Sequence, residues 1–141
     1  MLLTQKKNQY AIRAIFELAK RQGEGPIKIS EIARTQAIPQ RFLEVILGQL
    51  KGSGFVESKR GFYGGYALTR QPDKITVGDV FRHLEKRADD AHCMACESNG
   101  SCPFPSHCAF LPMWNQVRDA VFGIYDGTTI QDLLNNEKQR C

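Results

Sequence analysis

Apolar residues recur at helical spacing over the first twenty positions of the chain. They fall at i, i+3, i+4, i+7 and i+8, which is typical of one buried face of a helix. The residues of this stripe are Ala11, Ala14, Ile15, Leu18 and Ala19. The glycine- and proline-rich run at 23–26 ends the pattern. The sequence therefore predicts a first helix that ends near residue 22.

Two shorter helical patterns follow. The first carries Ile29, Ile32 and Ala33. Pro39 fits the first position of the second, because proline at that position loses no hydrogen bond. This third helix is expected to run to about Lys51, ahead of the Gly-Ser-Gly at 52–54. Its predicted apolar face consists of Phe42, Leu43, Ile46, Leu47 and Leu50.

The periodicity then changes from helix to strand. Residues 55–58 and 66–69 alternate as short strands, and the glycine-rich segment 59–65 between them predicts the turn of a hairpin. Three helices followed by a hairpin is the element order of a winged helix-turn-helix, which places its third helix in the major groove of DNA. We therefore expect a mainly α fold with a small β-hairpin wing.

The second half of the chain is again helical. Thr76 with Asp79 three residues later predicts a capping box at the start of a helix that reaches Leu84. A long apolar stripe runs from Leu111 to Ile124, and Thr128 or Thr129 begins a last short helix. The long helix is more apolar than a small domain needs, so it either packs on its own domain or, as we favour, is a dimerisation helix. The polar tail 135–141 is expected to fray.

These elements divide the chain into three parts. Residues 1–74 form the predicted winged helix-turn-helix domain. Residues 75–134 hold a connecting helix, a cysteine-rich loop and the C-terminal dimerisation helix, and residues 135–141 form the polar tail.

Charge separates the same two halves of the chain. Residues 1–74 contain 13 Lys and Arg against 6 Asp and Glu, whereas residues 75–141 contain 6 against 9. A basic first half is typical of a domain that meets a polyanion. The mean hydropathy is −0.37, and no apolar run approaches the roughly 20 residues of a membrane helix. With no signal peptide at the N-terminus, we expect a cytoplasmic protein without a membrane partner.

The chemistry of the third helix and of the hairpin fits DNA recognition. Arginine pairs with guanine, glutamine with adenine, and glutamate accepts from cytosine. In the hairpin, cations precede a turn whose glycines let the backbone approach a phosphate. Phe62 and Tyr63 at the tip either press against the DNA or fold back on the domain. The candidate DNA-binding residues are Gln40, Arg41, Glu44, Lys59, Arg60, Gly64 and Gly65.

Four of the five cysteines lie in one segment, at Cys93, Cys96, Cys102 and Cys108. Thiolates hold iron–sulfur clusters, and the same set suits tetrahedral zinc or a thiol switch without metal. Disulfides are less favoured in a reducing compartment. The fifth, Cys141, is expected to be a loose thiol, and His83 a packed or surface histidine.

Three segments of the chain resemble the IscR/NsrR family of winged-helix regulators. They are ISEIA at residues 29–33, IP at 38–39 followed by FLE at 42–44, and SKRGFYGGYAL at 58–68. The resemblance extends over about residues 1–134, and the wing motif is its most specific part. It implies a cytoplasmic bacterial homodimer that binds a partly palindromic double-stranded DNA operator and usually represses. It also implies base contacts from Gln40, Arg41 and Glu44, and backbone or minor-groove contacts from Ser58, Lys59 and Arg60.

The resemblance further implies that Cys96, Cys102 and Cys108 bind a 2Fe-2S or 4Fe-4S cluster. Some family members have a fourth ligand, histidine, three residues after the last cysteine, where this chain has Leu111. Others use a carboxylate from the N-terminal helix of the partner subunit, where this chain offers Asn8 and Gln9. We therefore expect Cys93 as the fourth ligand, with His92 and His107 as neighbours.

The sequence thus predicts a DNA-binding regulator controlled by a cluster that senses iron, redox state or nitric oxide. The alternative within the same fold is a cluster-free regulator with structural zinc or a thiol switch. A cysteine enzyme is disfavoured because no nucleophile, base and orienting group can be identified together. A winged domain that binds protein in place of DNA is the remaining alternative, and salt-insensitive behaviour would distinguish it.

Overall fold

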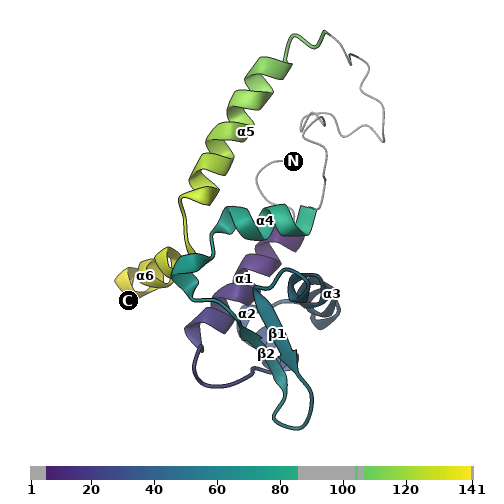
Figure 1. The fold of residues 1–141 in the computed structure, drawn as a ribbon, viewed down its shortest axis with the longest axis vertical. Coiled ribbons are helices and arrows are strands. Elements are labelled where there is room, and N and C mark those ends of the chain that lie inside the picture. Colours follow the sequence, from purple (N-terminus) through teal and green to yellow (C-terminus); the bar gives the residue numbers. More distant parts are fainter. Residues whose placement is uncertain (1–5, 86–103, 105–106, 141) are drawn as a thin grey trace.

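The computed structural model describes residues 6–85, 104 and 107–140 (Figure 1). Cys93, Cys96, Cys102 and Cys141 lie outside these residues. Helices form most of the described chain, with one two-stranded antiparallel hairpin. The elements are α1 (Lys6–Lys20), α2 (Ile29–Gln36), α3 (Gln40–Lys51), β1 (Val56–Lys59), β2 (Gly65–Leu68), a 3-10 turn η1 (Pro72–Lys74), α4 (Val77–Glu85), α5 (Leu111–Asp126) and α6 (Ile130–Arg140).

The first three helices and the hairpin share one apolar core. The stripe predicted on the first helix is buried, with Ala11, Ala14 and Ile15 fully enclosed on α1. It packs against α2 and against the buried side of α3. The four residues on that side of α3 are Leu43, Ile46, Leu47 and Leu50. This arrangement confirms the mainly helical winged fold expected from the sequence.

The prediction that Phe42 belongs to the buried side of α3 is wrong. Its side chain is 61% exposed and lies beside the ring of Tyr10, with centroids 6.3 Å apart. Successive residues turn about 100° around a helix, and the four buried residues already fill the arc that faces α1. Pro39 also precedes the helix as its N-cap, and Gln40 is the first helical residue.

The wing is held to the body by a third extended segment. β1 and β2 pair in antiparallel register from Val56↔Leu68 to Lys59↔Gly65. On the other side of β2, Ile27 and Tyr66 exchange two backbone hydrogen bonds of 2.8 Å. Gly65 has φ +155°, and a Cβ at this position would collide with the carbonyl of Ile27. Glycine is therefore required where β2 meets this segment.

The segments before α4 and before α6 both join the same core. Thr76 and Asp79 form the predicted capping box, with backbone-to-side-chain bonds of 3.0 and 3.2 Å. The segments before α4 and α6 also pair, because the N–H of Ile130 donates to the carbonyl of Ile75 at 2.9 Å. Both of these isoleucines are fully buried.

The last helix is longer than the sequence pattern predicts. Thr129 begins it with a second capping box to Asp132, at 2.9 and 3.1 Å. The expected fraying from Asn135 onward is wrong, because α6 remains helical to Arg140. Packing against α1 supports it, and Lys20 forms an ion pair with Glu137 at 3.2 Å.

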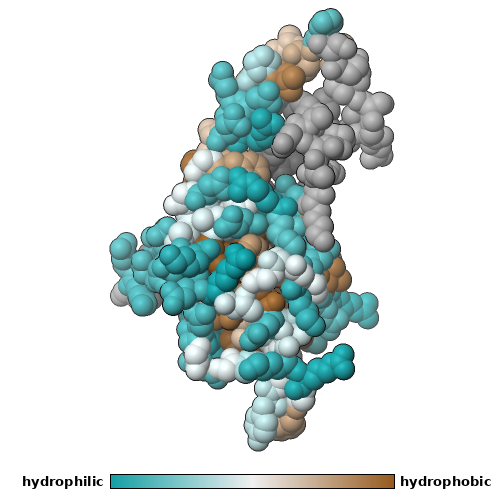
Figure 2. Space-filling model, viewed as in Figure 1, coloured by the Kyte–Doolittle hydropathy of each residue, from teal (hydrophilic) through white to brown (hydrophobic). Residues whose placement is uncertain are grey.

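One helix lies largely outside the core. In Figure 1, α5 projects from the winged domain and packs against α4 near its C-terminal end. None of its described residues is buried. Figure 2 shows apolar surface at its far end, where Phe110, Leu111 and Met113 are exposed.

We expect Gly65→Ala to destabilise the fold more than Gly61→Ala. Both glycines have positive φ, at +155° and +111°, but only Gly65 has backbone in the space of the new methyl group. The backbone strain is shared at about 1–2 kcal/mol, and the collision adds about 1–3 kcal/mol. Urea denaturation of the two variants measures the difference. Equal losses would show that the contact with Ile27 does not require glycine.

Candidate nucleic-acid interface

The face of α3 opposite the core is open to solvent and polar at its start. Gln40, Arg41 and Glu44 are all exposed, as the sequence predicts. The amide of Gln40 donates to the carboxylate of Glu44 at 3.5 Å. The glutamate thus lies where it can orient its neighbour, and N-terminal residues of such a helix are the ones that reach base edges.

The wing places further cations beside this helix. Lys59 and Arg60 are exposed at the end of β1, and Ser58 is half-buried on the same strand. Within the described residues, neither Lys59, Arg60 nor Arg41 forms an ion pair. Their charge therefore remains available to phosphates, which attract unpaired Lys and Arg strongly.

The aromatic residues at the wing tip point away from the domain. Phe62 is 78% exposed and Tyr63 is 87% exposed, so the alternative in which they fold back is wrong. Their rings meet edge to face at 5.1 Å, and the ammonium of Lys28 lies 4.9 Å from the Phe62 ring centre. Lys28, just before α2, was not among the predicted site residues, because its proximity to the wing depends on the tertiary fold.

The two predicted wing glycines have a clear structural role. Gly64 is buried, and a Cβ there would collide with the carbonyl of Lys59. Its N–H donates to the carbonyl of Gly61 at 3.0 Å, which closes the turn. Gly65 meets Ile27 as described above. The glycines therefore shape the loop that presents Lys59 and Arg60.

Only the last residue of the predicted cysteine set, Cys108, is among those described. Its thiol is free and half-buried, and its carbonyl accepts from the N–H of Leu111 at 3.3 Å, at the entry to α5. His107 beside it is exposed. The described part of the chain holds no group of three or more His, Cys, Asp or Glu able to bind a metal. The fit of a cluster therefore rests on the thiolate chemistry of the four cysteines.

Asn8 on α1, one of the two residues that this chain offers where some family members supply a cluster ligand, is engaged in a hydrogen bond. This side chain is 7% exposed, and its amide donates to the carboxylate of Glu85 at 3.1 Å. It joins the start of α1 to the end of α4, just before the cysteine segment.

A specific set of contacts holds α5 against α4. The guanidinium of Arg82 donates two hydrogen bonds of 2.6 Å to Asp126 and lies 5.2 Å from the ring centre of Phe122. These hydrogen bonds lower the pKa of Asp126 below its ordinary value. Phe81 and Tyr125 meet edge to face at 4.8 Å. A Cβ on Gly78 would collide with the Asp126 carboxylate, so the glycine permits this close packing.

α4 is thus joined to α5 through Gly78, Phe81 and Arg82, and its last turn also contacts α3. His83 bonds through Nε2 to the carbonyl of Gln49 on α3 at 2.8 Å and packs edge-on against Phe55. His83 is half-buried, in agreement with the prediction of a packed or surface histidine.

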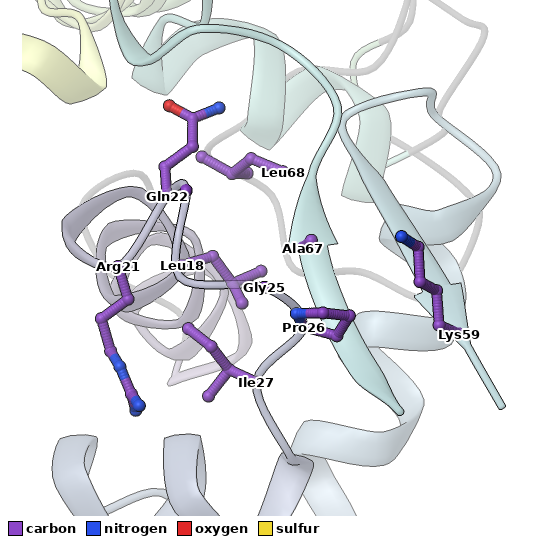
Figure 3. Close-up of a pocket in the computed structure, with 10 residues that line it drawn as sticks. Leu18, Arg21, Gln22, Gly25, Pro26, Ile27, Lys59, Ala67 and Leu68 are labelled. Carbon is purple, nitrogen blue, oxygen red and sulfur yellow. The ribbon is translucent and has the colours of Figure 1, made fainter. Parts of the chain in front are cut away.

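A small cavity of about 160 Å³ lies between the end of α1 and the wing (Figure 3). Its lining is largely aliphatic, with Leu18, Ile27 and Leu68. The charged end of Arg21 is directed away from the cavity in Figure 3 and binds Glu31 at 2.5 Å. The cavity therefore presents no catalytic constellation.

The sequence matches the model of the Rrf2 family, described as an iron-dependent transcriptional regulator, over residues 4–136. The chain belongs to the Rrf2 family. This confirms the resemblance to IscR-type regulators inferred from the wing and the third helix. Within this family, the exposed α3 and the wing form the DNA-binding winged helix of a transcriptional regulator.

Two regulators illustrate the similarity in sequence. The chain is 37% identical to the HTH-type transcriptional regulator CymR of Bacillus subtilis, over 92% of this chain and 87% of the relative. It is 30% identical to the HTH-type transcriptional regulator IscR of Escherichia coli O1:K1 / APEC, over 94% of this chain and 80% of the relative. Both relatives are transcriptional regulators, the class of protein that the sequence predicts in place of an enzyme.

Solved structures agree with the sequence comparison. T. potens IscR superimposes with a TM-score of 0.78 at 29% identity, covering 97% of this chain and 89% of that one. The structure of B. subtilis CymR, described as the global cysteine regulator, superimposes with a TM-score of 0.77 at 35% identity. The match covers 96% of this chain and 98% of that one. No helix among the described residues is long and apolar enough to cross a membrane.

We expect Asp126→Asn to loosen α5 at neutral pH. The side chains of Arg82 and Asp126 are 51% and 43% exposed, so solvent screening limits the loss to about 1 kcal/mol or less. Because the folded pKa of Asp126 is lowered, the wild-type advantage is present above the unfolded value of about 3.9. It is lost as the pH falls through the lower folded pKa.

Thermal denaturation from pH 3 to 7 and hydrogen exchange of the α5 amides measure this effect. Asp119→Asn is the matched control, because Asp119 lies on the same helix and, within the described residues, forms an ion pair only with the adjacent Arg118, at 3.3 Å. Faster exchange of α5 in Asp119→Asn than in Asp126→Asn would contradict the assignment.

Proposed function

We propose that this protein is a homodimeric regulator that binds a partly palindromic operator through α3 and the wing, and that its affinity is set by the cysteine segment. The single observation that carries the DNA-binding part is the exposed face of α3 beside an unpaired cationic wing. Gln40, Arg41 and Glu44 are the proposed base-reading residues. Ser58, Lys59 and Arg60 are proposed to contact the backbone or the minor groove, with Gly64 and Gly65 shaping the turn.

The homodimer is proposed to form through α5. Several apolar residues of α5 are exposed, among them Val117 at 37% and Ile124 at 68%. Exposed apolar surface of this extent typically marks an interface. A two-fold pair of winged domains also suits a palindromic operator, since the symmetry of the protein then matches that of the site.

Cys93, Cys96, Cys102 and Cys108 are proposed to hold an iron–sulfur cluster, of either the 2Fe-2S or the 4Fe-4S type. The family description as iron-dependent and the similarity to IscR support this proposal. When bound, the cluster would make the regulator responsive to oxidation, nitric oxide or iron scarcity, because each of these conditions removes it. Repression in the cytoplasm is the expected mode of action.

The chain provides a physical connection from this segment to the DNA-binding face. Cys108 adjoins the first turn of α5, the other end of α5 is bound to α4 through Asp126 and Arg82, and His83 of α4 contacts α3. A change in the constraint on Cys108 would thereby alter how α5 and the winged domain are held together. Such a change alters DNA affinity only if the two arrangements bind DNA differently.

The second candidate is a cluster-free regulator of the same fold. The similarity to B. subtilis CymR, described as the global cysteine regulator, favours this second candidate. In that case the same cysteines would act as a thiol switch or hold structural zinc.

We expect Arg41→Ala and Arg60→Ala to weaken DNA binding in different ways. Loss of a base contact at Arg41 relaxes the preference at one operator position by about 1–3 kcal/mol. Loss of a phosphate contact at Arg60 weakens binding to all DNA sequences by a similar factor. It also reduces the slope of log affinity against log salt concentration by about 1. Selection from random duplex DNA and titrations at several salt concentrations measure both.

Lys138→Ala serves as the control, because this exposed cation lies on α6, away from α3 and the wing in Figure 1. An unchanged sequence preference in Arg41→Ala would refute the base-reading assignment. An unchanged salt slope in Arg60→Ala would refute the phosphate contact.

We expect the protein purified without oxygen to contain iron and sulfide in equal amounts. The triple variant Cys96→Ser/Cys102→Ser/Cys108→Ser should lose both, because the cluster needs its thiolates. Cys141→Ser is the matched control and should retain them. Metal and sulfide analysis with visible spectra tests this, and zinc or no metal in the wild type would favour the cluster-free regulator.

A further inference from the structure

The second turn of α3 continues the exposed face that begins at Arg41. Arg41, Val45 and Gly48 lie at i, i+4 and i+7 and therefore share one side of the helix. Leu43, Ile46, Leu47 and Leu50 occupy the buried side. The line from Arg41 to Gly48 thus runs along the middle of the face that points away from the core.

Val45 has no folding role that explains its place on this line. It is 60% exposed, and a β-branched residue is a poorer helix former than alanine. The exposed Phe42 differs, because it has the ring of Tyr10 beside it. Val45 therefore presents two methyl groups to solvent at the centre of the helix face.

Gly48 is equally unexplained by packing. A Cβ built on it would meet nothing within 4 Å, and its φ is not positive. Glycine inside a helix is less stable than alanine. The missing side chain leaves a flat surface one turn after Val45, where another molecule can approach the backbone closely.

We propose that Val45 contacts the C5-methyl group of a thymine in the major groove, and that Gly48 leaves the space that lets the helix sit this deeply. The inference rests on the proposed function and extends base reading to the second turn of α3. Thymine is the base of choice because it alone carries a methyl group in the major groove. Val45 has no hydrogen-bonding group and can recognise only apolar surface.

The proposal also places the thymine relative to the base read by Arg41. Four helical residues span about 6 Å along the axis, and base pairs are stacked about 3.4 Å apart. The thymine should therefore lie within about two base pairs of the position that becomes degenerate in Arg41→Ala.

The test uses deoxyuridine, which is thymidine without the methyl group. Full-length wild-type protein first selects its operator from random duplex DNA, and each thymine of one half-site is then replaced by deoxyuridine. One replacement should weaken binding about fourfold, the effect of one buried methyl group. In Val45→Ala the same replacement should have no effect.

Two results would overturn the inference while the proposed function stands. In the first, the wild-type protein binds every deoxyuridine-substituted operator as tightly as the thymine operator. In the second, Val45→Ala loses as much affinity on deoxyuridine substitution as the wild type does. A wild type that prefers no DNA sequence would overturn the proposed function itself, and the inference with it.

Gly48→Ala separates DNA approach from folding. Because alanine favours the helix, this variant should melt about 3 °C higher. Its new methyl group should nevertheless weaken operator binding by at least about fivefold. Asn136→Ala, at an exposed position of α6, is the control that changes helix propensity without changing DNA binding. Undiminished operator binding by Gly48→Ala would overturn the role given to this glycine.

Discussion

The packing of α3 against α1 is the constraint on which the DNA-binding face depends. Leu43, Leu47 and Leu50 are fully buried in this contact, and each such side chain stabilises the fold by about 1.5–3 kcal/mol. Burial of these residues fixes the rotation of α3 about its own axis. Arg41 and Val45 are consequently turned outward, so the residues proposed to read DNA are positioned by the buried residues of the same helix.

The wing depends on the same core through a different kind of contact. Ile27, itself buried, pairs with Tyr66 through the backbone and leaves no room for a side chain at Gly65. Gly64 then closes the turn that presents Lys59 and Arg60. Close backbone packing therefore accounts for the two glycines of the wing. Lys59 and Arg60 are exposed and form no ion pair within the described residues.

The C-terminal half combines one part that belongs to the core with one part that does not. Ile130 anchors α6 beside Ile75, whereas α5 is attached through α4 and has no fully buried residue. This arrangement leaves α5 available for a second subunit. In the sequence, the cysteine segment follows α4 and precedes α5, the two helices that Arg82 and Asp126 join.

Much of this structure was determined by local sequence. The helical stripe of α1, the hairpin turn and the capping box of Thr76 and Asp79 depend on residues within a few positions of one another. A sequence pattern can therefore identify them. The cations at residues 59 and 60 and the wing motif at residues 58–68, which carries the family resemblance, could likewise be identified from the order of residues alone.

Other features were decided only by the tertiary structure. Phe42 is apolar but exposed because neighbours on α3 already fill the core, and α6 extends to Arg140 because α1 lies beside it. The contacts of Lys28 with Phe62 and of Asn8 with Glu85 join residues far apart in the chain. No local pattern encodes such pairs, because their proximity arises only when the shared core brings the helices together.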